Sequence, residues 1–529
     1  MHDYIIVGAG SAGCVLANRL SEDARMSVLL LEAGKPDRSL YIRTPMTASL
    51  LYKSSFDWAF ETEPQSSLDN RRMYFGRGKG LGGSSTINSM IYMRGARLDY
   101  DEWASMGNPG WSYADVLPYF KKLEHYERGA SEYHGVGGPL NVADLRSVNP
   151  LTRAFIESAV TTGYVRNDDF NGAAQEGVGQ FQVTQKDGQR HSAADAYLKP
   201  AQQRRNLKAI TDARVTRLLI EGSQVSGVTY LQNGRLQEAR ASRSVLLCGG
   251  AIHSPQLLML SGIGPAEHLR AMGIPVVSDL PGVGQNLQDH VAAGVICSCS
   301  RPISLNRTLT PLRLPGAIAR YALFRQGPLT SNVVEAGGFV RSLPDLPAPD
   351  LQFTFIPVWA LDHGLTRLKG HGFILVTLLL RPQSRGSISL RSSDPLDAPR
   401  IQPNYLTHED DRAALLRGIH LVRQITDTPP LAKLRRTERL PGAEAQSEEE
   451  LLTTIRAYAQ NGDHPVGTVK MGQDPLAVVD ARLRVHGLQG VRVVDASVMP
   501  TVPRGNTNIP TIMIAERAAD LIKEDDQRG

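Results

Sequence analysis

The chain has 529 residues, 41% of them hydrophobic and 21% charged, which is typical of a globular protein of two or three domains. Its formal net charge of +5 is small for this length and no long Lys/Arg run occurs, so nucleic acid is not expected as a partner. The chain has four cysteines, and Cys297 and Cys299 have no second Cys/His cluster nearby. We therefore expect no metal site and a reducing compartment.

The first element is an apolar, strand-like run that ends in the sequence Gly-Ala-Gly-Ser-Ala-Gly at residues 8–13, and a helical pattern follows at once. In such a fingerprint Gly8 allows a tight turn, Gly10 lets the backbone approach a pyrophosphate, and Gly13 lets the helix pack on the strand. The helix start also directs free N–H groups at the phosphates. A second apolar run ends in Glu32, near where an acidic side chain binds a ribose hydroxyl. The stretch therefore predicts a dinucleotide site.

The same stretch bears on location. The cofactor strand starts at residue 4, which leaves no room for a signal peptide ahead of it. The longest apolar run, residues 373–380, is too short to cross a bilayer. We expect a cytoplasmic protein, with peripheral contact at the inner face of the membrane as the alternative.

A second glycine-rich stretch spans residues 76–90. So many glycines beside Ser and Thr suit a loop whose backbone approaches a large planar or phosphorylated ligand. The alternative is a flexible surface loop, but such a loop would carry more charge in place of Leu81, Ile87 and Met90.

Further strands return the chain to the cofactor sheet. Residues 207–230 alternate in hydrophobicity around two glycine turns, which predicts a small antiparallel sheet inserted between halves of the parallel one. Residues 245–250 are typical of a buried strand and are followed by a helical pattern from Pro255 to Leu260. Near the end of the chain, residues 491–496 form a strand pattern that reaches Asp495, and residues 510–522 form an amphipathic helix with Pro510 in its first turn.

The middle of the chain differs in character. Residues 351–356, 373–380 and 387–390 alternate as strands, and residues 409–426 read as a polar helix. A further helix should start after Ser447, whose spacing to Glu450 has the form of a capping box, and run to about residue 460. No nucleotide fingerprint occurs here, so we place the substrate-facing sheet in this segment. The predicted fold class is α/β, with a discontinuous cofactor domain at residues 1–300 and 456–529 and a substrate domain at 301–455.

The number of fingerprints limits the cofactor. A single strand–glycine–helix unit argues against a flavin reductase that also binds NAD, because two dinucleotides would need two sites. The glycine-rich loop near residue 80 and the strand near residue 495 indicate one long cofactor that contacts distant parts of the chain. FAD fits this pattern better than NAD.

Four ordered motifs carry a resemblance to the glucose–methanol–choline (GMC) family of FAD-dependent oxidoreductases over nearly the whole chain. They lie at residues 76–88, 250–265, 464–472 and 495–511. The chain resembles the bacterial alcohol and choline dehydrogenase-like branch and hydroxymethylfurfural oxidase more than the fungal glucose oxidases. This implies the GMC fold, a Rossmann-type FAD-binding domain with a discontinuous substrate domain of mainly antiparallel sheet plus helices.

The resemblance also implies a reaction. It is the oxidation of a primary aliphatic or aryl alcohol to an aldehyde, with hydride passing to flavin N5 and electrons then to oxygen, a quinone or another acceptor. By motif match His464 is the base, and a neutral imidazole suits that role. Asn508 falls at the partner position, where an amide can donate a hydrogen bond to the substrate oxygen. The alternative is that Asn506 or Asn508 simply caps the following helix.

The fingerprint and the resemblance together imply a set of FAD contacts. Residues 88–91 would lie at the flavin, Asp495 and Ala496 near the ribityl chain, Val215 at the adenine, and the helix start near Pro510 at flavin N1/O2. Some relatives attach FAD through a His just before the Asn of the glycine-rich loop; this chain has Ile87 there, so we expect non-covalent FAD. The full set is Gly8, Gly10, Ser11, Ala12, Gly13, Glu32, Ala33, Gly83, Asn88, Ser89, Met90, Ile91, Val215, Asp495, Ala496 and Pro510.

Two alternatives to simple alcohol oxidation stay open. One is a different reaction on the same scaffold, hydroxynitrile lyase-like or fatty-acid photodecarboxylase-like, which anaerobic mixing with an alcohol would distinguish. The other is choline dehydrogenation, with Glu335 facing the cationic head group. An aromatic cage should then accompany Glu335, and the sequence indicates none.

Overall fold

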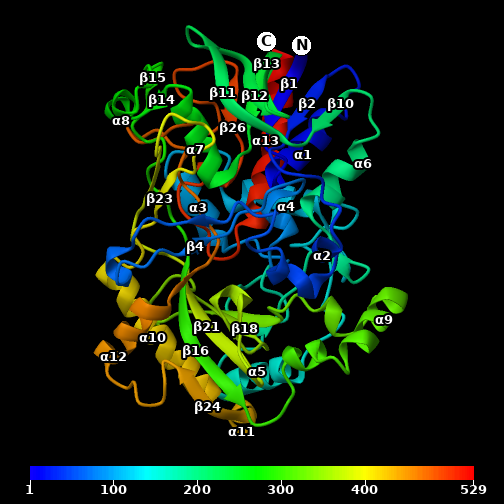
Figure 1. The fold of residues 1–529 in the computed structure, drawn as a ribbon, viewed down its shortest axis with the longest axis vertical. Coiled ribbons are helices and arrows are strands. Elements are labelled where there is room, and N and C mark those ends of the chain that lie inside the picture. The colour runs from blue at the N-terminus through cyan, green and yellow to red at the C-terminus, as the bar shows by residue number, and fades with distance from the viewer. Residues whose placement is uncertain (529) are drawn as a thin grey trace.

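The computed structural model describes residues 1–528, which form two large sheets (Figure 1). The first sheet lies in the upper half of Figure 1, beside both chain termini. Its order is β10-β2-β1-β13-β12-β11, and β26 also pairs with β13. Its strands are β1 (His2–Val7), β2 (Val28–Leu31), β10 (Leu207–Ile210), β11 (Ala213–Glu221), β12 (Gln224–Gln232), β13 (Arg235–Leu247) and β26 (Val491–Val493).

The strand β13 belongs to two kinds of pairing. Its first half runs antiparallel to β12, whereas its end, residues 245–247, is buried and runs parallel to β1 and β26. Because β1, β2, β13 and β26 are all parallel there, their carboxyl ends meet at one edge of the sheet, where ligands bind in open α/β folds.

One sequence expectation about this sheet was wrong. Residues 207–210 do not join an antiparallel insertion, because β10 pairs in parallel with β2 at the edge of the cofactor sheet. β11 pairs antiparallel with β12, as expected, and β12 in turn pairs antiparallel with the first half of β13. An alternating pattern reports that one face is buried but does not distinguish parallel from antiparallel partners.

The second sheet is antiparallel throughout and fills the lower half of Figure 1. Its order is β24-β16-β21-β18-β17-β7, with β25 beside β16. The predicted strands at 351–356 and 373–380 are confirmed as β18 and β21. The strands are β7 (Gly177–Gln180), β16 (Val291–Cys299), β17 (Ala336–Val340), β18 (Leu351–Ile356), β21 (Gly372–Leu379), β24 (Arg435–Leu440) and β25 (Gln460–Asn461).

Three strands of this sheet come from outside residues 301–455. They are β7, β16 and β25, so the chain enters the sheet before the expected substrate segment and completes it afterwards. The boundaries at 301 and 455 stay a prediction, while the sheet itself is assembled from more of the chain than this segment contains.

The two faces of the second sheet have different neighbours. Phe353, Phe355 and Leu375 pack in the core toward helices α5 (Pro150–Thr161) and α10 (Glu409–Thr426), with Phe355 stacked on Phe155 at 4.8 Å. The alternate residues of the same strands, such as Ile356 and Val376, line a cavity on the opposite face.

The helices largely follow the expected ranges. The helix at 409–426 is confirmed as α10. The predicted helix after Ser447 is α12, and the Ser447 Oγ accepts from the Glu450 N–H at 3.3 Å. This helix ends at Tyr458 rather than at about residue 460. Helix α12 spans Glu448–Tyr458. The other helices of two turns or more, together with three short ones, are α1 (Ser11–Leu20), α2 (Leu40–Arg43), α3 (Arg97–Ser105), α4 (Tyr113–Leu123), α7 (Gly250–Leu260), α8 (Ala266–Ala271), α9 (Leu314–Phe324), α11 (Leu431–Leu434) and α13 (Asn508–Arg528).

The helix predicted from Pro255 begins earlier, because α7 starts at Gly250 and contains the proline. A proline inside a helix leaves the carbonyl four residues before it without its usual partner. That carbonyl belongs to Ala251, and the Thr468 hydroxyl donates to it at 2.7 Å. The proline is therefore tolerated because the 464–472 motif satisfies the free carbonyl.

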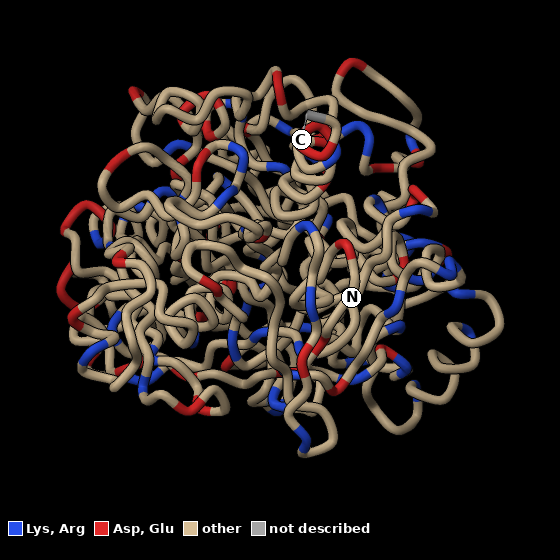
Figure 2. Tube along the Cα trace, turned by 90° about the horizontal axis from the view of Figure 1, so that it is seen from above, with Lys and Arg blue, Asp and Glu red and all other residues tan. Residues whose placement is uncertain are grey.

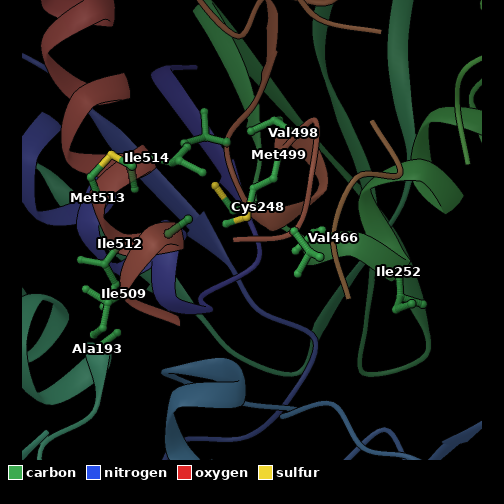
Figure 3. Close-up of a cluster of buried hydrophobic side chains, with 14 of the residues drawn as sticks. Ala193, Cys248, Ile252, Val466, Val498, Met499, Ile509, Ile512, Met513 and Ile514 are labelled. Carbon is green, nitrogen blue, oxygen red and sulfur yellow. The ribbon is translucent and has the colours of Figure 1, made fainter. Parts of the chain in front are cut away.

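A buried apolar cluster fixes several of these segments to one another (Figure 3). Side chains from the first turns of α13, Ile509, Ile512 and Met513, belong to the same buried cluster as Cys248, directly after β13, and Val466. The start of α13 and the 464–468 segment are therefore anchored to the edge of the cofactor sheet.

The surface carries charges of both signs, interspersed over most of the molecule (Figure 2). None of the helices within residues 1–528 is long and apolar enough to cross a membrane.

Candidate active site

A cavity of about 1210 Å³ connects the edge of the first sheet to one face of the second. Gly10, Glu32, Asn88 and His464 all line it, as do Ile356 and Val376 of the second sheet. The volume exceeds the roughly 300–1,000 Å³ of most small-molecule sites, as a dinucleotide together with a substrate requires.

The fingerprint glycines test whether a dinucleotide fits. Gly8 has φ +100°, and a Cβ there would lie 2.7 Å from the Cys248 carbonyl oxygen; a Cβ on Gly13 would lie 1.9 Å from the Gly8 oxygen. Those two glycines therefore serve the packing of strand, turn and helix. A Cβ on Gly10 would come no closer than 4.0 Å to Cys248 and meets open space at the cavity wall. This is the space that a pyrophosphate would occupy, so the residues fit the group.

Glu32 ties three segments together. Its carboxylate accepts from the backbone N–H groups of Ala9 at 2.8 Å, Gly34 at 2.7 Å and Gly80 at 3.1 Å. Burial raises the pKa of Glu32, and these N–H donors oppose the rise. The side chain thus joins the fingerprint turn to the glycine-rich loop, and it also lines the cavity where a ribose would lie.

The glycine-rich loop packs directly on the fingerprint turn. Gly83 has φ +51°, and a Cβ there would lie 2.7 Å from Gly10 Cα, which leaves no space for a side chain. Further along, Asn88 Oδ1 accepts from Arg190 at 2.7 Å and from the Met90 N–H at 3.1 Å. Met90 has φ +58°, so this hydrogen bond supports a bend of the backbone into the cavity.

Two helix N-termini converge on the cavity. Helix α1 starts at Ser11 with no side-chain cap, which leaves its first N–H groups free toward the cavity. Helix α13 starts at Asn508, whose Oδ1 accepts from the Ser11 hydroxyl at 2.6 Å. Both positive helix ends therefore favour an anionic or electron-rich ligand between them.

Asp495 holds the return from β26. Its two oxygens accept from Ser254 Oγ and the Gly250 N–H on one side and from the Ser497 hydroxyl and N–H on the other, at 2.5–2.8 Å. Asp495 and Ala496 line the cavity, as does Val215 at a register shift in β11.

Most of the predicted contacts share the cavity. Gly13 and Pro510 are the two that do not line it, because Gly13 packs under the turn and Pro510 is buried within the first turn of α13. The residues that do are Gly8, Gly10, Ser11, Ala12, Glu32, Ala33, Gly83, Asn88, Ser89, Met90, Ile91, Val215, His464, Asp495, Ala496 and Asn508.

The loop that carries His464 is held on three sides. Its backbone N–H donates to Asp289 Oδ1 at 2.7 Å, and Tyr405 donates to the other Asp289 oxygen at 2.5 Å. Gly462 N–H donates to the His290 carbonyl at 2.6 Å, and Arg77 donates to the Asp463 carbonyl at 2.7 Å. These contacts fix the position of the imidazole at the cavity wall.

Hydrogen bonds also define the tautomer of His464. The Asn506 amide nitrogen lies 2.9 Å from His464 Nε2, and because an amide nitrogen can only donate, Nε2 carries the lone pair. The ring proton is then on Nδ1, 2.9 Å from Nδ1 of His290, which accepts it. His464 is thus oriented with its basic nitrogen toward Asn506.

Burial keeps both histidines neutral. Burial lowers the pKa of His464 well below its usual value, and the proximity of His290 and Arg77 lowers it further. Burial likewise lowers the pKa of His290 to about 3. A neutral imidazole, with its Nε2 lone pair at the Asn506 amide, is the form that accepts a proton.

The amide beside the histidine differs from the one that the motif match suggested. Asn508 does not contact His464 in the described chain, because its oxygen is bonded to Ser11 at the start of α13; Asn506 takes the place beside Nε2. Asn506 Oδ1 is buried without a hydrogen-bond partner among the described residues, and its side chain lines the cavity. One residue separates these asparagines, and which one faces His464 depends on where α13 begins.

The Glu335 side chain does not line the cavity. Its side chain is fully buried and accepts from Ser331 at 2.6 Å, from Thr152 at 2.6 Å and from the Asn149 N–H at 2.7 Å. It does not line the cavity, so it cannot meet a cationic head group there without losing these bonds.

Sequence reasoning missed the support of His464. Asp289 and His290 stand immediately before β16, and no spacing or motif in the sequence connects them to a residue 174 positions later. Their polar character just before a buried apolar strand was the one local signal, and it did not indicate a partner.

The fold and the cavity define a dinucleotide-dependent oxidoreductase with a neutral histidine at its reaction end. Models of the GMC oxidoreductase family match residues 2–292 and 382–515. The chain is 47% identical over 528 residues to an alcohol dehydrogenase [acceptor] of Pseudomonas putida, covering 99% of this chain and 96% of that one. It is 47% identical over 530 residues to an oxygen-dependent choline dehydrogenase of Ectopseudomonas mendocina, covering 99% and 94%. The crystal structure of pyridoxine 4-oxidase from Mesorbium loti superposes with a TM-score of 0.90 at 34% identity, covering 98% and 99%.

The chain therefore belongs to the GMC oxidoreductase family. The expected α/β fold with a Rossmann-type cofactor sheet is confirmed, and so is FAD as the cofactor.

Proposed function

We propose that the protein oxidises a primary alcohol, aliphatic or aryl, to the aldehyde. The observation that carries this proposal is the neutral His464, oriented by His290 and Asn506 at the cavity wall. The alcohol hydroxyl would take the place of the Asn506 amide at His464 Nε2, donate there and lose its proton as the carbon gives up a hydride. FAD, when bound, supplies the hydride acceptor.

The other residues of the site prepare it for that step. The Asn506 amide lies where it can donate to the substrate oxygen and orient it, without competing for its proton. The first turn of α13 presents a positive helix end that favours negative charge arriving on the cofactor. Asp289 holds the His464 backbone, so the imidazole keeps its place when a substrate binds.

The cavity walls favour an apolar substrate. One face of the second sheet presents Ile296, Ile356, Ile374 and Val376 to the cavity, several residues along their strands from His290 and His464. Choline dehydrogenation is the second candidate, since choline dehydrogenases are among the named relatives. The Glu335 carboxylate is already hydrogen-bonded to Ser331 and Thr152, so it is not free to bind the cationic head group of choline. Choline therefore has less support as the substrate than an uncharged alcohol.

We expect FAD to be bound without a covalent link. Ile87, the residue before Asn88, is buried and offers no nucleophile. Acid precipitation should therefore release the flavin into the supernatant; flavin that stays with the precipitate would contradict this.

The experiment that tests the function is anaerobic mixing of the holoenzyme with a panel of alcohols, followed by air. Bleaching of the flavin by aliphatic or aryl primary alcohols would support the proposal. Fast bleaching by choline alone would favour the second candidate. No bleaching by any alcohol would favour a lyase-like or photochemical reaction on this scaffold.

Reoxidation by air would identify oxygen as an acceptor, and slow reoxidation would favour a quinone or another acceptor. A cytoplasmic location stays a prediction.

A further inference from the structure

A short helix beside the mouth of the cavity exposes apolar side chains to solvent. Leu323 and Phe324 at the end of α9 are 73% and 64% exposed, and Leu312 just before the helix is 91% exposed. Figure 1 shows α9 at the outer edge of the molecule, to the right of the second sheet. Leu323 and Phe324 are adjacent at the end of α9 and Leu312 lies before its start, so apolar side chains are exposed along the helix, which marks an interaction site. We call Leu312, Leu323 and Phe324, together with the arginines around them, the α9 surface.

The helix is attached through its other residues. Tyr321 is buried with Met46, Leu305 and Leu329, and its hydroxyl donates to the Arg43 carbonyl at 3.3 Å. Leu314, Ile318 and Tyr321, spaced four and three residues apart, line the cavity. The face of α9 that points toward the protein is therefore taken up by packing and by the cavity wall. The apolar side chains of the α9 surface have no partner in the described chain.

The charge around this surface has one sign. Residues 301–325 hold five arginines and neither Asp nor Glu, and the adjoining residues 38–50 add two arginines and again no acid. None of these seven guanidinium groups forms an ion pair with any residue that the structure describes. Elsewhere along the chain, Lys and Arg positions are interspersed with Asp and Glu positions (Figure 2). The seven are Arg38, Arg43, Arg301, Arg307, Arg313, Arg320 and Arg325.

We propose that the α9 surface docks the protein on an anionic lipid membrane. Apolar side chains on an interfacial helix enter the boundary between headgroups and acyl chains, and arginines beside them meet the lipid phosphates. A second copy is a poorer occupant, because a two-fold contact would bring the same uncompensated arginines face to face. Docking here is peripheral, in keeping with the absence of a membrane-spanning helix in residues 1–528.

Docking would also place the cavity mouth at the lipid surface. Leu309 and Ile318 line the cavity while being 36% and 50% exposed, so the cavity reaches the surface beside α9. An apolar alcohol dissolved in the bilayer would then meet the mouth directly. The docking itself is independent of the proposed function and is tested without turnover.

The test is co-sedimentation of the holoenzyme with vesicles of phosphatidylglycerol and phosphatidylethanolamine, against vesicles of phosphatidylcholine. We expect binding to the anionic vesicles that weakens as salt is raised. Leu323→Asp with Phe324→Asp should weaken it by about tenfold or more, and Arg313→Glu with Arg320→Glu should do the same. The matched controls are Leu236→Asp and Arg235→Glu at the start of β13, where Leu236 is 66% exposed; they should bind as the parent does.

None of the four test positions lines the cavity, so flavin reduction by a water-soluble alcohol should be unchanged in every variant that folds. If the aspartate pair fails to fold, the arginine pair tests the same surface by charge alone. The proposal is overturned if the parent does not bind anionic vesicles or if the α9 variants bind as the controls do. It is also overturned if the parent is a dimer in solution that the α9 variants dissociate while vesicles capture neither form.

Discussion

Two asparagines two positions apart have different partners. Asn506 donates to His464 Nε2 at 2.9 Å, whereas Asn508 accepts from Ser11 at 2.6 Å and joins the starts of α1 and α13. The chemistry of an amide is the same in both, so the backbone around the start of α13 decides which one meets the reacting atoms.

This difference predicts two distinct phenotypes. Asn506→Ala should retain FAD and slow anaerobic flavin reduction by about ten- to hundredfold, because it removes the amide beside the base. Asn508→Ala should change reduction less and weaken FAD retention, since it loosens the two helix starts. The measurements are stopped-flow reduction and the flavin-to-protein ratio. Reversed phenotypes would show that Asn508 is the partner of His464.

The depressed pKa of His464 predicts a pH profile. The base works only when neutral, and burial lowers its pKa well below the usual 6.5. The rate constant for flavin reduction should therefore be flat from about pH 8 to pH 6.5 and fall only at lower pH. An acid limb centred at or above pH 6.5 would contradict the burial that the structure gives this histidine.

The first strand, turn and helix act as one element, and its three glycines have different tasks. Gly8 and Gly13 sit against backbone, while Gly10 faces open space at the cavity. The residues are adjacent in sequence, so their spacing alone predicted the element correctly.

Alanine at these positions should separate folding from cofactor binding. Gly8→Ala places a Cβ 2.7 Å from a carbonyl oxygen at φ +100°, which should lower the free energy of unfolding by at least about 2 kcal/mol. Gly10→Ala should leave the apoprotein as stable as the parent and weaken FAD binding by about tenfold or more, because the methyl group enters the pyrophosphate space. Chemical denaturation of the apoproteins and FAD titration measure the two effects. Equal loss of stability in both variants would contradict the assignment.

The features that the sequence did not predict depend on contacts between segments far apart in the chain. The fingerprint, the capping box at Ser447 and helices α10 and α13 depend on neighbours within a few turns, and all were predicted. The edge position of β10 and the contact between His290 and His464 depend on pairings of segments far apart in the chain. No local pattern records such pairings, and so the support of the base became visible only in the fold.

At the scale of the whole molecule, the cavity joins segments from nearly every part of the chain. Glu32, Asn88, Val215, His464 and Asp495 all line it. A cofactor that spans these segments contacts both sheets at once, and the apoprotein lacks these contacts.

FAD removal should therefore lower the stability of both parts together. At free FAD of 100 times Kd, binding to the folded state alone adds about 2.7 kcal/mol to the free energy of unfolding. Thermal unfolding of apo- and holoprotein, followed by circular dichroism, should show a single transition that moves to higher temperature with FAD. A transition that does not move with FAD concentration would contradict binding across these segments.

The central claim is that His464 removes the hydroxyl proton, and His464→Ala tests it most directly. His420→Ala, an exposed position on α10, is the matched control. We expect His464→Ala to fold and retain FAD, and to reduce its flavin with the best alcohol at least about a hundredfold more slowly than the parent in anaerobic stopped flow. His420→Ala should match the parent. Flavin reduction by His464→Ala at a rate close to that of the parent would contradict the claim.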